Sequence, residues 1–443
     1  MPKALLIIGG RVIDPGQGLD MDCDVLIADG KVAWVGPRKD MPQVPCDVLH
    51  AAGMVVCPGF IDLHCHLREP GFEDKETIAS GTRAAAAGGF TTVCAMANLD
   101  PPTDTAAAVD FIRRRAVMEG AIRVLPVGCI TAGRAGEQLV NVEELAEAGA
   151  VALSDDGDAV IDARLMRSAL ESAHLFDLFI IEHCEDPSLS AGGVMNKGEI
   201  AERLGLKGIP ADAEESMVSR DISLSQLTGG HLHITHTSTT GSAMQLRHAH
   251  EMGYPVTADV TPHHLTLTEE RVVSSDGKAD TMSKVNPPLR SEQDVAALVA
   301  GLRDGYIQAI ATDHAPHTAA DKDCDFDKAA FGISGLETAL GNVMSLVHRG
   351  DLELATLIAG LTSGPARVLS RAEIGTLEPG AEGDVCIFDP HAEWVVDPDK
   401  FESKGRNTPL AGVKLRGRVM ATIYGGNIVY KDDSIKIDAR GGK

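Results

Sequence analysis

Short apolar segments alternate with helical segments through most of the chain. Eight runs have the length and apolar character of buried strands, and apolar residues recur at helical spacing in the segments that follow them. The expected strands are residues 60–64, 90–96, 122–130, 148–154, 178–183, 231–236, 255–260 and 306–313. The clearest expected helices are residues 75–87, 105–118, 162–173, 212–227, 241–251, 291–302 and 335–347. This pattern predicts a (β/α)8 TIM barrel, whose active site lies at the carboxyl ends of the strands.

An open, doubly wound sheet is the alternative for alternating strands and helices. Its dinucleotide-binding form carries G-x-G-x-x-G after an early strand, and the sequence has no such motif there. The barrel is therefore the preferred fold.

The two ends of the chain follow a different pattern, with short strands and no helical period. Asp29-Gly30 is a strong hairpin signal near the amino end, and Gly425-Gly426 separates two strands near the carboxyl end. We expect the two ends to form one small β-sandwich domain, from residues 1–56 and 373–443, around a barrel of residues 57–372. The expected strands are residues 4–8, 11–14, 24–28, 32–35, 384–388, 421–424 and 427–430.

Composition and charge exclude several classes of protein. With 64 acidic and 40 basic side chains the formal net charge is -24, which argues against binding to nucleic acid or to an anionic membrane surface. The apolar runs are far shorter than the roughly 18 residues of a membrane span. The amino-terminal segment, Met1-Pro2-Lys3 and the apolar residues after it, does not resemble a secretory signal, so we expect a cytoplasmic protein. The nine cysteines include no C-x-x-C pair, which favours reduced, mostly buried thiols.

The first barrel strand carries the sharpest chemical signal. In the segment P-G-F-I-D-L-H-C-H-L-R-E-P-G, residues 58–71, alternation places Asp62, His64 and His66 on one face and Ile61, Leu63 and Cys65 on the other, which we expect to pack outward. Two imidazoles then converge at a strand end. H-x-H alone is weak evidence, since such a pair is often structural, but its position at the end of a barrel strand favours a metal site.

Four later strands also end in histidine or aspartate. Asp155 and Asp156 follow the fourth strand, where either could instead be a turn or cap residue, and the residues alone do not choose between them. His183, which could be a core histidine, ends the fifth strand, His236 ends the sixth and Asp313 ends the eighth. In the sixth strand we expect His231 and His233 to face outward as structural residues.

Convergence of five strand ends argues against a structural explanation for all of these residues together. Imidazole and carboxylate ligands suit zinc, although other divalent metals are alternatives. Four histidines and two aspartates exceed the ligands of one catalytic zinc, so two metals sharing a carboxylate fit better.

Several motifs together resemble the dihydroorotases of the amidohydrolase superfamily, specifically the class I bacterial type. They are the first-strand segment above, E-H-C-E-D, H-I-T-H-T-S, V-T-P-H-H-L, N-P-P-L-R and A-T-D-H-A-P-H, and the resemblance spans essentially the whole chain. It implies a barrel of the amidohydrolase type that binds two Zn²⁺ per chain, with Asp156 as the bridging carboxylate. The implied metal ligands are His64, His66, Asp156, His183, His236 and Asp313.

The resemblance also implies a substrate and a reaction. The enzyme would close N-carbamoyl-L-aspartate reversibly to L-dihydroorotate in de novo pyrimidine biosynthesis. In the reverse direction a hydroxide bridging the metals would attack the ring amide, and Asp313 would carry the proton to the ring nitrogen. Implied substrate contacts are Arg68, Asn98, Asn286, His317 and backbone amides near Ala330 and Gly332.

Rival functions remain at this point. Hydantoinases or dihydropyrimidinases and allantoinases are related cyclic amidohydrolases, and Arg68 separates them because their substrates need not carry a carboxylate. A catalytically dead barrel that scaffolds aspartate transcarbamoylase is the non-enzymatic alternative, against which the full ligand set argues. We expect a homodimer and leave a complex with aspartate transcarbamoylase open.

Overall fold

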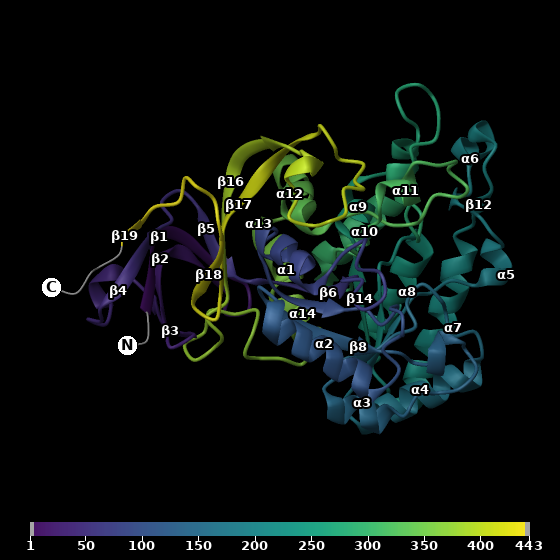
Figure 1. The fold of residues 1–443 in the computed structure, drawn as a ribbon, viewed down its shortest axis with the longest axis horizontal. Coiled ribbons are helices and arrows are strands. Elements are labelled where there is room, and N and C mark those ends of the chain that lie inside the picture. The colour runs from purple at the N-terminus through teal and green to yellow at the C-terminus, as the bar shows by residue number, and fades with distance from the viewer. Residues whose placement is uncertain (1–3, 439–443) are drawn as a thin grey trace.

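A parallel eight-stranded barrel forms the larger part of the protein (Figure 1). The computed structural model describes residues 4–438, so Met1-Pro2-Lys3 of the amino-terminal segment and residues 439–443 lie outside the description. Neighbouring strands pair in chain order, and a parallel bridge between Cys65 and His314 closes the ring. The barrel strands are β6 (Phe60–Cys65), β7 (Phe90–Ala95), β8 (Arg123–Gly128), β9 (Ala152–Leu153), β10 (Phe179–Glu182), β13 (Leu232–Ile234), β14 (Val256–Val260) and β15 (Ala309–Ile310). The predicted barrel is confirmed.

All seven predicted helices are present around the barrel. Two of them, α1 and α10, begin at Thr77 and Ser291, where the side chain and the third helical residue form a reciprocal capping box. An eighth helix, α3, was not predicted because it spans only seven residues. The helices that cover the barrel are α1 (Ile78–Ala87), α2 (Ala106–Glu119), α3 (Val142–Ala148), α4 (Ala163–Leu175), α7 (Asp212–Thr228), α8 (Thr240–Glu251), α10 (Glu292–Asp304) and α12 (Ala339–Arg349).

Shorter elements lie in the connections between the barrel strands and helices and between strands of the chain ends. Between β10 and α7 the chain forms a small excursion with its own two-stranded parallel sheet. The additional elements are α5 (Pro187–Ser190), β11 (Met195–Asn196), α6 (Glu199–Leu204), β12 (Gly208–Ile209), α9 (Pro262–Thr266), α11 (Ala319–Lys322), α13 (Leu354–Leu361), α14 (Ser363–Val368), and the 3-10 turns η1 (Arg38–Asp40), η2 (Ala132–Arg134), η3 (Glu269–Val272), η4 (Thr281–Ser283), η5 (Leu336–Thr338) and η6 (Pro398–Lys400).

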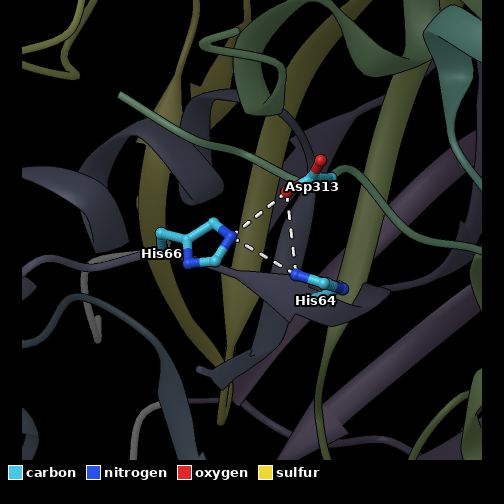
Figure 2. Close-up of side chains that lie close together, drawn as sticks. All are labelled: His64, His66 and Asp313. Atoms are coloured by element: carbon cyan, nitrogen blue, oxygen red, sulfur yellow. Dashed lines mark hydrogen bonds and ion pairs between the residues drawn. The ribbon is translucent and has the colours of Figure 1, made fainter. Parts of the chain in front are cut away.

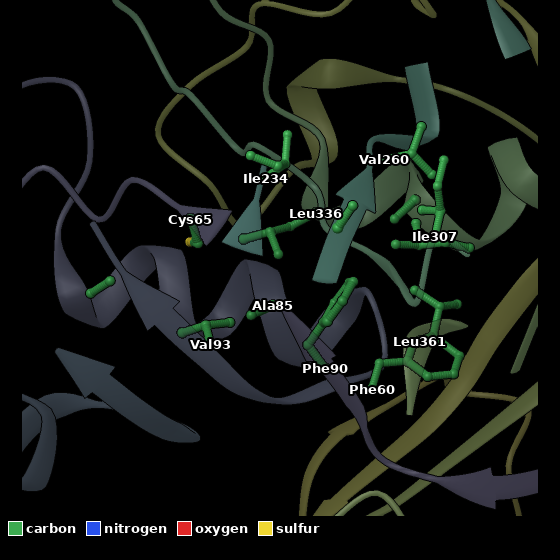
Figure 3. Close-up of a cluster of buried hydrophobic side chains, with 14 of the residues drawn as sticks. Phe60, Cys65, Ala85, Phe90, Val93, Ile234, Val260, Ile307, Leu336 and Leu361 are labelled. Carbon is green, nitrogen blue, oxygen red and sulfur yellow. The ribbon is translucent and has the colours of Figure 1, made fainter. Parts of the chain in front are cut away.

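Two apolar layers hold the barrel together. The larger lies between the strands and the surrounding helices and includes Phe60, Val93 and Ile234 (Figure 3). The smaller gathers side chains from six strands inside the barrel, among them Ile61 and Leu63. The expectation that Ile61 and Leu63 pack outward is therefore wrong. Both faces of a barrel strand are apolar, so hydrophobicity alone does not tell them apart.

The two chain ends together form a nine-stranded mixed sheet, which confirms the predicted composite β-domain (Figure 1). Strand β5 joins its halves, because it pairs in parallel with β1 and antiparallel with β16. The Asp29-Gly30 turn links β2 and β3 with positive φ at both residues, as predicted. The strands are β1 (Ala4–Asp14), β2 (Leu19–Ala28), β3 (Lys31–Gly36), β4 (Cys46–His50), β5 (Val55–Pro58), β16 (Val385–Val395), β17 (Lys414–Tyr424), β18 (Asn427–Lys431) and β19 (Ile437–Asp438).

All nine cysteines are free thiols, and eight of them are buried while Cys324 is exposed. Within residues 4–438, no helix has both the length and the apolar character needed to cross a membrane.

Candidate metal centre and substrate cleft

Three predicted ligands meet at the carboxyl ends of β6 and β15. His64 Nε2 and His66 Nε2 lie 3.3 Å apart, and Asp313 Oδ1 is 3.2 Å from His66 Nε2 and 3.6 Å from His64 Nε2 (Figure 2). All three side chains are buried, and their ligand atoms are close enough to hold one ion. The structure thus brings two residues of the first strand and one of the last to a single point.

Asp156 lies between this group and a second pair of histidines. Its Oδ2 is 3.4 Å from His64 Nε2 and 3.5 Å from His66 Nε2. Its Oδ1 is 3.5 Å from His236 Nε2 and 3.8 Å from His183 Nδ1. The two histidines of the second pair are 3.0 Å apart. Each carboxylate oxygen therefore faces a different pair of imidazoles, which is the arrangement that a carboxylate shared by two metals requires.

The adjacent Asp155 has a different environment. Its Oδ1 accepts hydrogen bonds from the amides of Ile130 (2.8 Å) and Thr131 (3.1 Å), and its Oδ2 accepts one from the Thr131 hydroxyl. Asp155 is thus occupied in joining two strand ends, whereas Asp156 faces the histidines.

Partners on the far side of the His64 and His66 rings turn the other ring nitrogen toward the cluster. Thr235 donates its hydroxyl proton to Asp259 (3.0 Å), so its oxygen accepts from His64 Nδ1 at 2.7 Å. His66 Nδ1 lies 2.9 Å from Asn98 Oδ1, which accepts its proton. These contacts orient both rings so that their Nε2 atoms face Asp313 and Asp156, as metal ligation requires.

His183 is turned the other way round. Its Nε2 lies 3.4 Å from Glu185 Oε2, so Nδ1 is the nitrogen that faces Asp156 and His236. His183 nevertheless falls outside the two tightest groups of ligand atoms, which are His64, His66 and Asp313, and His64, Asp156 and His236.

The carboxylates and imidazoles of this cluster shift one another's pKa values. Burial lowers the pKa of His64, but the negative charges of Asp156 and Asp313 outweigh it and raise that pKa to about 10. Burial acts in the opposite direction on Asp156, yet His64 and His236 hold its pKa well below the ordinary value. A divalent cation that binds His64 must displace its proton, so metal uptake is coupled to proton release.

Three residues of this site have a strained backbone conformation. Arg68, His236 and Asp313 have φ values of 59°, 37° and 45°, in the left-handed region that residues other than glycine seldom adopt. Such conformations cost free energy and persist where the surrounding structure enforces them, often at functional sites.

The side chains predicted to contact the substrate lie around the cluster and are half-buried. Arg68 Nε donates to Pro316 O (3.4 Å), and His317 Nε2 donates to Phe331 O (2.8 Å). Burial, with the positive charges of Arg68 and Lys75, lowers the pKa of His317 to about 3, so its imidazole is neutral.

The two predicted asparagines bracket the metal-ligand cluster. Asn98 Nδ2 is 3.4 Å from Asp156 Oδ2, beside the first pair of histidines. Asn286 Nδ2 donates to Glu185 Oε2 (2.7 Å), while its buried Oδ1 has no partner in the described part of the chain. A cleft of about 510 Å³ opens beside His183 and Glu185.

The loop that carries Ala330 and Gly332 lies beside His317, but its two predicted amides have partners. Ala330 N donates to Asp321 O (3.0 Å), and Gly332 N donates to Lys284 O (2.9 Å). In this arrangement neither amide is free to cap a ring.

Three predictions about strand faces are wrong. The Asp62 carboxylate accepts from Thr312 N (2.8 Å), Thr312 Oγ1 (2.5 Å) and His64 N (3.2 Å), so it joins β6 to the end of β15 instead of joining the histidine rings. His233 is buried and bonds Asp259 Oδ2 at 2.9 Å, and His231 stacks on Phe179, a residue of the barrel interior. Neither histidine faces outward.

Sequence reasoning also missed the residues behind the ligands, Thr235, Asp259, Glu185 and Arg134. Arg134 donates to the carbonyl oxygens of Asp155 (3.2 Å) and Asp156 (2.6 Å) and so holds the turn that carries the shared carboxylate. Thr235 and Glu185 lie next to predicted ligands in the sequence, whereas Asp259 and Arg134 do not.

Residues 53–242 match the family described as dihydro-orotase-like, and residues 226–430 match an amidohydrolase family. A dihydroorotase of Anaeromyxobacter dehalogenans (strain 2CP-C) is 52% identical over 432 residues, 98% of this chain and 99% of the relative. A dihydroorotase of Pelotomaculum thermopropionicum is 52% identical over 433 residues, 98% of this chain and 100% of the relative.

Solved structures confirm the fold. The L-hydantoinase (dihydropyrimidinase) of Arthrobacter aurescens has a TM-score of 0.86 at 23% identity, with 99% of this chain and 98% of that chain covered. The dihydropyrimidinase of Brevibacillus agri NCHU1002 has a TM-score of 0.84 at 22% identity, with 99% and 97% covered. At such identities these likenesses show the fold alone, whereas the closer relatives show the family. On that evidence the chain belongs to the dihydroorotase family, within the amidohydrolases.

Proposed function

We propose that this protein is a metal-dependent dihydroorotase that interconverts N-carbamoyl-L-aspartate and L-dihydroorotate in pyrimidine biosynthesis. The observation that carries the proposal is the single cluster formed by histidines and aspartates from five strand ends. Dihydroorotases that are 52% identical over nearly the whole chain support the same activity.

The cluster fits two divalent metals, which we propose to be zinc. His64, His66 and Asp313 would hold one ion, His183 and His236 the other, and Asp156 would be shared. Two ions held there would polarise the ring amide and lower the pKa of a water between them.

Asp313 is the proposed proton carrier. Burial opposes its charge, but hydrogen bonding to His66 and the nearby charge of His64 hold its pKa below the ordinary value, so it is a carboxylate able to accept a proton. In hydrolysis it accepts the proton of the attacking water and delivers it to the departing ring nitrogen. One group thus serves as general base and then as general acid.

Arg68, Asn98, Asn286 and His317 are proposed to bind the substrate. A guanidinium grips a carboxylate through charge-assisted hydrogen bonds, and the half-buried Arg68 lies next to His317 at the edge of the metal-ligand cluster. On the loop of Ala330 and Gly332, the intervening amide of Phe331 donates to no described residue, so it is the group left to contact the ring.

The direct test is hydrolysis of dihydroorotate by purified protein of measured metal content. Metal-loaded protein that folds but does not turn over dihydroorotate would contradict the proposal. If it then binds aspartate transcarbamoylase, the scaffold alternative applies. Turnover of hydantoins or dihydrouracil in preference to dihydroorotate would favour the hydantoinase alternative, and preferential turnover of allantoin would favour an allantoinase.

Elemental analysis is expected to find two divalent metals per chain in active protein. The expectation rests on two pairs of imidazoles that face opposite oxygens of Asp156. Since metal binds the folded protein, its removal should also lower the melting temperature. A plateau at one metal per fully active chain would refute the binuclear site.

Arg68→Met is expected to keep both metals and to lower kcat/KM for dihydroorotate about 10- to 100-fold. This is the effect expected from the loss of one hydrogen bond to a charged group, which contributes roughly 1.5–3 kcal/mol. Arg164→Met, which alters an exposed arginine paired with Asp162, is the control and should leave kcat/KM unchanged. Near-normal kcat/KM in Arg68→Met would place the carboxylate elsewhere.

The reaction equilibrium is expected to depend on pH in one direction. Hydrolysis opens the ring to a new carboxylic acid with a reference pKa near 4, so at neutral pH it releases a proton. The ratio of carbamoyl aspartate to dihydroorotate should therefore rise about tenfold for each pH unit above about 5. Equilibrium mixtures approached from both sides provide the measurement, and a constant ratio would exclude this reaction.

The homodimer, the complex with aspartate transcarbamoylase and the cytoplasmic location remain predictions. Size measurement of the purified protein, alone and with aspartate transcarbamoylase, tests the first two.

A further inference from the structure

Residues 402–409 run from the carboxyl-terminal part of the chain to the mouth of the barrel. Ser403 Oγ donates to Glu76 Oε2 at 2.5 Å, and the same Glu76 oxygen is 3.3 Å from His314 Nε2, the residue after Asp313. Gly405 passes so close to the next loops that a Cβ there would lie 2.4 Å from Ser334 Oγ and 2.5 Å from Pro316 Cβ. We call residues 402–409 the strap.

Asn407 is the residue of the strap that joins two active-site loops. Its side chain accepts hydrogen bonds at Oδ1 from His317 N (2.9 Å) and Ser334 Oγ (2.9 Å). Its Nδ2 donates to Ala315 O (3.0 Å) and Gly332 O (3.0 Å). The residue is 2% exposed, and the side chain makes the four hydrogen bonds that an amide can make.

Both joined loops carry proposed substrate contacts. One contains His317, whose ring donates to Phe331 O across the gap between the loops. The other contains Ala330, Phe331 and Gly332, and its opposite side is held by two buried lysines. Lys284 Nζ donates to Ala329 O (2.7 Å), and Lys322 Nζ donates to Ala330 O (2.7 Å).

We propose that Asn407 is a positioning residue for substrate binding, which fixes the His317 loop and the Ala330–Gly332 loop at their working separation. It does this without contact to the metal-ligand cluster, since its polar partners all belong to the two loops. The inference rests on the proposed function, because it assigns Asn407 to the substrate contacts of that reaction.

The chemistry of the site requires an amide. Two backbone carbonyls face Nδ2 while an amide and a hydroxyl face Oδ1, so an aspartate would place a carboxylate oxygen against two carbonyl oxygens. Alanine would leave all four partners without a hydrogen bond in a buried place.

The test compares Asn407→Ala and Asn407→Asp with wild type and with Asn342→Ala. Asn342 is a matched control, because it is also buried and bonds Pro262 O (3.2 Å) and Thr266 Oγ1 (2.9 Å), away from the two loops. Both Asn407 variants are expected to keep their metal and to raise KM for dihydroorotate at least about tenfold, with a smaller change in kcat. Asn342→Ala should lower the melting temperature but leave KM within about twofold.

A double-mutant cycle separates positioning from general destabilisation. If Asn407 acts through His317, Asn407→Ala should add little to the KM of His317→Ala, whereas independent effects would multiply. KM within about twofold of wild type in folded Asn407→Ala, or fully multiplicative effects, would overturn the inference.

A milder variant tests the inference even if the Asn407 variants do not fold. Ser334→Ala removes only one partner of Asn407 Oδ1 and is expected to raise KM about threefold, so an unchanged KM there would also overturn it. Wild-type protein that does not turn over dihydroorotate would instead refute the proposed function, and the two failures are therefore distinguishable.

Discussion

Asp313→Asn is expected to lower kcat for dihydroorotate hydrolysis by about 10²- to 10⁴-fold, the usual contribution of a positioned general acid or base. Asparagine has the same shape but cannot accept and return a proton. Its side-chain oxygen can still face His66, so most of the metal should remain bound. The measurement is steady-state hydrolysis together with metal analysis of the same sample.

The control for this variant is Asp158→Asn. Asp158 lines the neighbouring cleft, but its exposed carboxylate pairs with Arg134 at 2.7 Å and lies outside the groups of potential metal ligands. It should change kcat by less than about threefold. A loss of kcat in Asp313→Asn that only matches its loss of metal would mean that Asp313 is a ligand and not the proton carrier.

The alternation of strands and helices could be predicted from the sequence because burial gives each strand and each helix its own pattern of apolar residues. Strand lengths could not. The last strand was predicted as residues 306–313, yet β15 is only Ala309–Ile310, because the chain then leaves the ladder to bond Asp62 through Thr312 and to place Asp313 at a φ of 45°. An apolar run does not reveal where hydrogen bonding to the neighbouring strand stops.

The faces of the strands were harder to predict than their positions. Simple alternation grouped Asp62 with His64 and His66, but the pairing of β6 with β7 shifts register between Asp62 and Cys65. Such an irregularity changes which residues share a face, and it depends on a neighbouring strand. Alternation likewise put His233 outside, although a buried carboxylate, Asp259, meets it inside the barrel.

The histidines and aspartates that meet in the cluster could be predicted because they end five separate strands, although only the family resemblance favoured Asp156 over Asp155. Their supporting residues could not, since the contacts join distant parts of the chain. Thr235 is 171 positions from His64, and Asn407 is 90 positions from His317. Threonine and asparagine are ordinary residues, and only folding shows what they hold.

Asp156→Ala is expected to lose metal from both positions, whereas Asp155→Ala should keep most of it. The reason is geometric: the two oxygens of Asp156 face separate pairs of histidines, while Asp155 bonds the amides of Ile130 and Thr131. Asp155→Ala should lower the melting temperature instead, because two buried amides and a hydroxyl lose their acceptor. Metal content of the two purified variants is the measurement, and equal loss would show that Asp156 is not shared.

The same assignment makes activity independent of carbon dioxide. Metals in many related sites are bridged by a lysine that carbon dioxide has carboxylated, but none of the eight barrel strands contains a lysine. Asp156 already supplies a carboxylate at the shared position. Protein stripped by a chelator should therefore regain full activity when zinc is added in bicarbonate-free buffer, with a parallel sample in bicarbonate as the control. An absolute requirement for bicarbonate would mean that a carbamate, and not Asp156, bridges the metals.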